Sequence, residues 1–130
     1  MMCCKNLFLS LVFLGFTSAC FGDTTLYHIV SKKELNNLTE NNIYSPASIE
    51  LEGYIHFSKL ELIMSYANGP YIDRDVLYLL EVKFLDDDQD LRWIGDNPDY
   101  YSGLDLNMVN RKAEFTRGEN GLWIMPEIFQ

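Results

Sequence analysis

Cysteine and basic residues are scarce in this chain of 130 residues, and each scarcity excludes some functions. The three cysteines are Cys3, Cys4 and Cys20, so everything after Cys20 lacks a thiol. That part of the chain has no internal disulfide, no Cys-based metal site and no thiol nucleophile. Ten Lys and Arg against nineteen Asp and Glu give a formal net charge of -9, which argues against nucleic acid or an anionic membrane surface as a partner.

Histidine is equally scarce, and the sequence signatures of several enzyme classes are missing. His28 and His56 are the only histidines, and neither stands in a spaced set of metal ligands, so we predict no metal site. No Gly-x-Ser-x-Gly elbow and no phosphate-binding glycine loop occurs. The two histidines lie in short apolar segments, where a polar ring is costly without a partner, and they become the candidate site.

The first 22 residues indicate a secretory signal peptide. Residues 6–16 are apolar but shorter than the roughly 20 residues of a membrane span, and Thr17-Ser18-Ala19 supplies small residues before a cut. We expect cleavage after Ala19, export to the periplasm or the medium, and no membrane span after cleavage. The alternative is a lipid anchor on Cys20, although Thr17 stands where such signals usually have Leu.

Residues 23–130 suffice for one small domain, which we predict to be α+β. Two capping-box patterns predict early helices, one starting at Ser31 and reaching about Thr39, the other with Ser58 as its N-cap. Strands are predicted at residues 26–30, 54–57, 76–84, 91–94, 107–115 and 122–125. Residues 95–103 are predicted to be turn-rich, and the sheet mixed or mostly antiparallel.

Strand alternation groups the candidate site residues. Tyr54, His56 and Ser58 point to one side of their strand, beside the start of the next helix, where negative charge is favoured. A satisfied core histidine or an exposed strand residue is the alternative for His56. His28 shares its face with Leu26 and Val30, which fits a half-buried histidine equally well.

A second group of candidates follows later in the chain. Arg92 beside Trp93 can hold an anion while the indole stacks on a base or nicotinamide ring, although a surface arginine over a core tryptophan also fits. Tyr101, in the segment 99–103, is a candidate for the lip of a cleft or for a lid over the core.

These segments resemble a bacterial domain family of unknown function numbered 952, over roughly residues 25–126. The resemblance is carried by Tyr27-His28-Ile29, Tyr44-Ser45-Pro46-Ala47-Ser48, Glu52-Gly53-Tyr54-Ile55-His56-Phe57-Ser58, Leu79-Leu80-Glu81-Val82, Leu91-Arg92-Trp93 and Tyr101-Ser102-Gly103-Leu104. The Gly-aromatic-Ile-His-Phe-Ser run is the most specific of these motifs.

That family is similar in fold to the ADP-ribosyltransferases, which implies a small split β-sheet with an NAD-binding cleft. By this likeness His28 matches the histidine that holds a ribose, and His56 with Ser58 matches the nicotinamide-side position. The chain departs from its relatives at three places. Ile94 stands where they have Glu, Asp99-Tyr100 where they have Pro-His, and Leu62 where they have Gln.

Two functions follow as expectations. One is a transferase-like domain that binds NAD or a related nucleotide, with His28, Tyr54, His56, Ser58, Arg92, Trp93 and Tyr101 as ligand contacts and no catalytic residue assigned. The other is a non-catalytic exported binding protein that retains the fold, which the missing Glu and His favour, as does export away from cytoplasmic NAD. The sequence predicts no oligomeric state.

Overall fold

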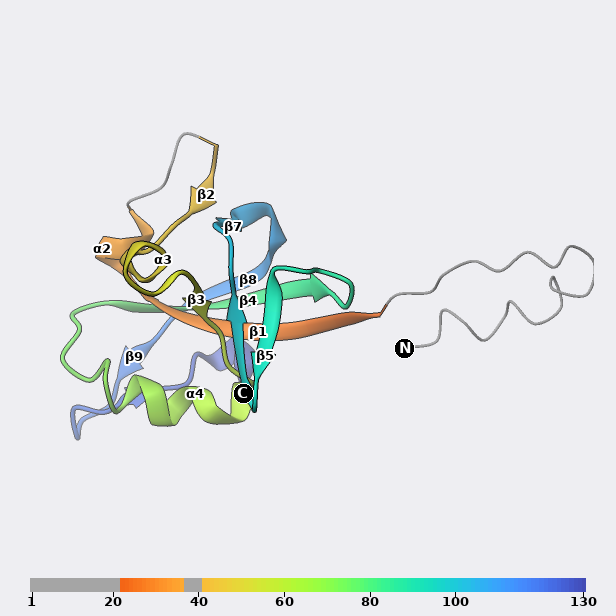
Figure 1. The fold of residues 1–130 in the computed structure, drawn as a ribbon. Helices are drawn as coiled ribbons and strands as arrows, with labels where there is room; N and C mark the ends of the chain where they lie inside the picture. The colour runs from red at the N-terminus through yellow and green to blue at the C-terminus, as the bar shows by residue number, and fades with distance from the viewer. Residues whose placement is uncertain (1–21, 37–40) are drawn as a thin grey trace, which may run out of the picture.

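Two long antiparallel strands form the centre of the computed structural model, which describes residues 22–36 and 41–130 (Figure 1). β1 (Asp23–Ser31) pairs with β4 (Leu77–Leu85) along its whole length, and β8 (Val109–Glu114) pairs with the other edge of β4. β4 is central and mostly buried, as its almost continuously apolar first half predicts. A register shift between Glu81 and Val82 interrupts the pairing of β4 with β8.

A second antiparallel sheet of three strands, ordered β3-β6-β5, lies against the first. The strands are β3 (Ile55–His56), β5 (Leu91–Ile94) and β6 (Asn97–Tyr100). Two further strand pairs complete the β-structure, β2 (Ile43–Tyr44) with β7 (Leu104–Asp105) and β9 (Thr116–Arg117) with β10 (Trp123–Ile124).

A short backbone bridge joins the two three-stranded sheets. Tyr27 in β1 and Ser58, just beyond β3, exchange two N–H···O=C hydrogen bonds of 2.9 Å each. His28 and His56 flank this bridge along their own strands. The bridge therefore fixes how the two histidine-bearing segments meet.

Helical segments cover the sheets and confirm an α+β fold. They are α2 (Lys32–Leu35), α3 (Ala47–Glu52), α4 (Leu60–Ala67) and the 3-10 turns η2 (Leu106–Met108) and η3 (Glu127–Phe129). In Figure 1, α4 lies on one side of the paired β1 and β4, with α2 and α3 on the other. In the described part of the chain, no helix is long and apolar enough to cross a membrane.

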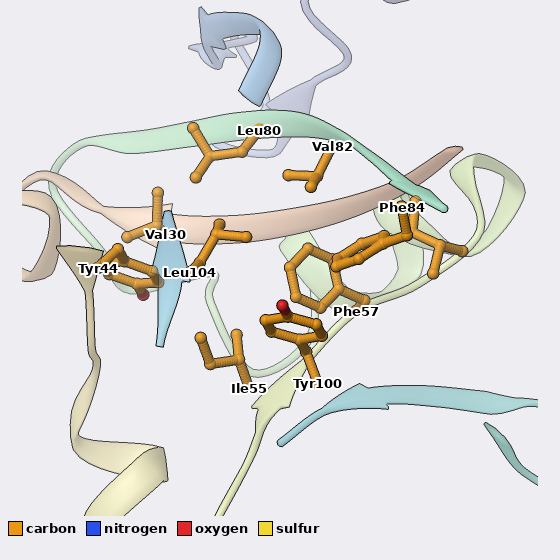
Figure 2. Packing of buried hydrophobic residues seen from close by; sticks show 10 residues of the cluster. Val30, Tyr44, Ile55, Phe57, Leu80, Val82, Phe84, Tyr100 and Leu104 are labelled. Carbon is orange, nitrogen blue, oxygen red and sulfur yellow. The ribbon is translucent and has the colours of Figure 1, made fainter. Parts of the chain in front are cut away.

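Among the residues that the structure describes, the buried hydrophobic side chains form two clusters. Figure 2 shows the first, in which Phe57, Phe84 and Tyr100 pack their rings between the two sheets. Its other members are Leu26, Val30, Tyr44, Ile55, Leu80, Val82 and Leu104. The second cluster packs under α4 and consists of Ile29, Ile63, Ala67, Leu77, Leu79, Phe115, Trp123 and Phe129. Together they enclose β1 and β4.

Several sequence predictions are confirmed and others are wrong. The capping box at Ser31 forms as predicted, and the bounds of β5 agree. Ser58 does not cap α4, because the helix begins one residue later with Lys59 as N-cap, while Ser58 is held in the bridge. Residues 97–100, predicted as turn-rich, form the central strand β6.

The sequence does not predict helix α3, because its residues offer few helix signals. It has six residues, none of them buried, and Pro46 at its N-cap makes no side-chain capping bond. The predicted signal peptide, Cys20 and the predicted helix end at Thr39 lie outside the described residues.

Candidate functional site

A pocket of about 710 Å³ opens between β1, the β3-β6-β5 sheet and α4. Most of its wall is aromatic or apolar, with a few polar groups from β1, β3 and β6. It is lined by Tyr27, His28, Ile29, Tyr54, His56, Phe57, Ser58, Ile63, Tyr66, Pro70, Tyr71, Ile94, Asn97, Asp99 and Tyr101. Concave apolar sites with a few placed polar groups are typical of small-molecule sites.

His56 lies between two carboxylates at this pocket. Its Nε2 is 2.8 Å from Glu52 Oε2, and its Nδ1 is 3.3 Å from Asp99 Oδ1. Glu52 ends α3 and Asp99 lies opposite His56 in the register of β3 with β6. The His56 side chain is 56% exposed, so it is accessible both to solvent and to a ligand. One imidazole bridging two carboxylates can hold and transfer a proton.

Asp99 is the buried acid of the pocket, with only 7% of its surface exposed. Burial raises the pKa of its carboxyl above the ordinary value, and the neighbouring His56 offsets part of that rise. Glu52 adds a further small increase to the same pKa through charge repulsion. The pKa of Asp99 is therefore perturbed by its surroundings, and perturbed pKa values are common where a protein binds or transforms a ligand.

His28 is buried, and both of its ring nitrogens have partners. Nδ1 lies 2.6 Å from the carbonyl oxygen of His56, and Nε2 lies 3.0 Å from the Tyr44 hydroxyl. A carbonyl only accepts, so Nδ1 carries the proton and Nε2 accepts from Tyr44. Burial lowers the pKa of His28 to about 4, which keeps the ring neutral at pH 7. The hydrogen bond from His28 to the His56 backbone thus links β1 to β3.

A row of flat side chains forms one wall of the pocket. The Tyr54 ring meets His56 edge-on at 4.9 Å between centroids and packs against Tyr101 at 5.1 Å. The guanidinium of Arg92 lies over the Tyr101 ring at 4.6 Å from its centroid. This row presents aromatic surface to the pocket and ends in a positive charge at Arg92.

The structure brings together five of the seven residues predicted as ligand contacts. His28, Tyr54, His56, Ser58 and Tyr101 all line the pocket.

The other two lie beside it. Arg92 stacks on Tyr101, and Trp93 is 43% exposed with the Lys59 ammonium 5.8 Å from its ring. Neither side chain lines the pocket.

The sequence does not predict that Asp99 and Glu52 contact His56. In the sequence Asp99 stands out only as a departure from the family pattern and as part of the segment 99–103, and Glu52 only as part of the Glu52–Ser58 motif. Glu52 precedes His56 by four residues across the α3–β3 junction, and its contact depends on the turn at Gly53. Asp99 reaches His56 only through pairing of distant strands.

Another buried acid, Glu81, does not line the pocket. It accepts hydrogen bonds from Arg111 Nε at 2.8 Å, Asn110 Nδ2 at 2.7 Å and the Tyr27 hydroxyl at 3.0 Å. The Arg111 bond is the main reason that its pKa falls to about 2. Glu81 is therefore a structural acid outside the pocket. Within residues 22–36 and 41–130, no group of three or more His, Cys, Asp or Glu side chains is placed to hold a metal ion.

Comparison with known proteins identifies the family. Residues 29–111 match the family described as "Protein of unknown function (DUF952)". The chain belongs to this family. Comparison with curated proteins gave no match. The matched residues include most of the segments that form the pocket. They contain β1 from Ile29 onward, α3, β3, α4 and β6.

Solved structures of another protein share the fold. The crystal structure of a double mutant of protein CC0527 from Caulobacter crescentus is 25% identical, with a TM-score of 0.68 over 78% of this chain and 94% of that chain. The solution NMR structure of CC0527 is 23% identical, with a TM-score of 0.63 over 80% of this chain and 92% of that chain. The DUF952 chain described here therefore has the same arrangement of elements as CC0527.

Proposed function

We propose that this chain binds NAD or a related nucleotide in the pocket between β1, β3, β6 and α4. The observation that carries the proposal is the division of charge across the site. The pocket has an aromatic wall and contains the acid Asp99. Two cations lie beside it: Arg92 stacks on the lining residue Tyr101, and Lys59 lies over the ring of Trp93. Such a site suits a ring and sugar inside and phosphates at the edge.

The pocket size agrees with this proposal. About 710 Å³ lies inside the range of roughly 300–1,000 Å³ typical of small-molecule sites. Tyr54 and Tyr101 offer surface to a base or nicotinamide ring, and Ser58, Asn97 and Asp99 offer polar groups to ribose hydroxyls. The resemblance to an ADP-ribosyltransferase-like fold, drawn from the sequence, is part of the same proposal.

In this proposal His28 has a different role from the one that the family likeness implies. Both of its nitrogens are engaged by His56 and Tyr44, so it positions the strand that bears His56. The contact with a ribose hydroxyl falls instead to Asp99, whose carboxylate lies in the pocket.

The test is calorimetry of the purified protein with NAD and with ADP-ribose. We expect saturable binding with Kd in the micromolar to millimolar range, and weaker binding by Arg92→Gln because a phosphate contact is lost. Lys112→Gln is the matched control, since Lys112 lies over the Tyr78 ring and outside the pocket. Absence of heat with either ligand at millimolar concentration, from folded protein, contradicts the proposal.

The second candidate is a binding protein without catalysis. It is favoured by the pairing of both nearby carboxylates, Glu52 and Asp99, with His56, since a transferase needs a carboxylate to stabilise a cationic sugar. Incubation with NAD separates the two functions. Release of nicotinamide indicates a transferase or hydrolase, and binding without release indicates a binding protein. Export, with Cys20 as an alternative lipid anchor, remains part of both proposals.

A further inference from the structure

The charged groups at the pocket are mainly acidic. None of its lining residues in the described part of the chain is Lys or Arg, while Asp99 lies in the wall and Glu52 contacts the lining residue His56. Two carboxylates face one imidazole, so with both carboxylates ionised the cluster keeps a negative charge whether His56 is neutral or protonated. A ligand group placed here is therefore favoured if it is positive and disfavoured if it is an anion.

Arg92, the cationic residue opposite Asp99 in the neighbouring strand, does not neutralise this negative charge. Arg92 pairs with Asp99 between β5 and β6, but its guanidinium stacks on Tyr101 and forms no ion pair with Asp99 in the described residues. This contact places a flat cation over one tyrosine ring of the wall, a geometry in which a cation and an aromatic face attract each other. Tyr54, Tyr66 and Tyr71 also line the pocket.

We propose that the pocket selects a cationic nitrogen heteroaromatic ring of the N-alkylpyridinium class over a neutral ring of the same shape. The carboxylates of Asp99 and Glu52 supply the attraction, and Tyr54 and Tyr101 supply the aromatic surface. This inference rests on the proposed function, because the oxidised nicotinamide of NAD is such a ring. It adds that the reduced, neutral dihydronicotinamide binds more weakly.

The probes are two small rings without phosphate. 1-Methylnicotinamide is permanently cationic, and nicotinamide is its neutral counterpart of nearly the same shape. Titration of the purified protein, followed by NMR of the aromatic signals of the pocket, gives both affinities. We expect the cationic ring to bind about tenfold more tightly, the size of effect that a desolvated cation–π contact with a nearby carboxylate provides.

Two variants test the origin of the preference. Asp99→Asn keeps the shape of the side chain and removes its charge, so the preference for the cation should fall severalfold. Glu52→Gln, at the exposed end of the cluster, should reduce it less, because water screens that carboxylate. Asp96→Asn, in the exposed turn between β5 and β6, is the matched control and should leave the preference unchanged.

The outcomes separate this inference from the nucleotide proposal. Equal affinities for the two rings, or an Asp99→Asn variant with an undiminished preference, overturn charge selection. If NAD and NADH then bind equally well, the nucleotide proposal stands alone. If 1-methylnicotinamide binds and NAD does not, charge selection stands and the nucleotide proposal fails. Dispersed NMR spectra of each variant verify that it is folded.

Discussion

At the scale of single residues, the Tyr44 hydroxyl is the partner that keeps buried His28 satisfied. Tyr44 is 1% exposed and its hydroxyl donates to His28 Nε2 at 3.0 Å. Tyr44→Phe leaves that nitrogen buried without a donor, so we expect the free energy of unfolding to fall by about 1–3 kcal/mol in urea titrations. Tyr78→Phe is the control, because the Tyr78 hydroxyl makes no hydrogen bond in the described residues. Equal small losses in both variants would contradict this role.

We expect the buried carboxylate of Asp99 to lower the stability of the fold, although our proposal gives it a role in ligand binding. Its pKa is raised by burial, so the folded chain favours the protonated carboxyl and its ionisation opposes folding as the pH rises above 3.8. We therefore expect Asp99→Asn to raise the urea midpoint at pH 7, and this gain to shrink as the pH falls toward 3.8. Asp96→Asn, an exposed substitution on the same hairpin, should change neither. A destabilised Asp99→Asn protein would mean that attraction by His56 outweighs burial.

The sequence predicts the part of the site that lies along one segment, residues 54–58 around β3. Alternation alone places Tyr54, His56 and Ser58 on one side, and all three line the pocket. Asp99 joins them only because β6 pairs with β3 in one register, which no local pattern specifies. The hydrogen bond that satisfies buried His28 Nε2 likewise comes from a different strand, because its donor is the Tyr44 hydroxyl in β2.

At the scale of elements, α3 ends in a turn that only a few residues can adopt. Gly53 has φ of 92°, and a Cβ there would meet no atom within 4 Å, so substitution costs backbone energy without a clash. Gly53→Ala should lower the free energy of unfolding by about 1–2 kcal/mol. Gly53→Asn should cost less, because Asn tolerates this left-handed conformation. Chemical denaturation of both variants checks the order, and an Ala variant as stable as the Asn variant would contradict it.

Elements with strong local signals were predicted, and elements that depend on tertiary context were not. β4 is almost continuously apolar in its first half and central in its sheet, and the capping box at Ser31 is complete in the sequence itself. β6 contains Asn97-Pro98, which is typical of a turn, yet Pro98 is buried and its carbonyl accepts from the Phe57 N–H at 3.0 Å. Pairing with β3 and β5 on both sides overrides the local turn signal.

At the scale of the whole molecule, two buried groups should govern acid unfolding. His28 has its pKa lowered to about 4, so stability falls as the pH drops from 6.5 toward 4, where the unfolded chain binds a proton that the folded chain does not. Glu81 has its pKa lowered to about 2, so its contribution is full above 4.5 and is lost as the pH falls toward 2. Acidification should therefore destabilise the fold in two successive ranges.

Glu81→Gln separates the two ranges. Removing the carboxylate leaves Arg111 without its ionic partner, so we expect a loss of about 2–3 kcal/mol at pH 7, at the low end for a buried pair because Arg111 is partly exposed. Urea midpoints measured from pH 7 to pH 2 should show the decline between 6.5 and 4 in both proteins, since His28 is unchanged. Below pH 4.5 the native protein should approach the variant, because its Glu81 becomes protonated. A constant difference down to pH 2 would mean that Glu81 stabilises the fold through its shape rather than through its charge.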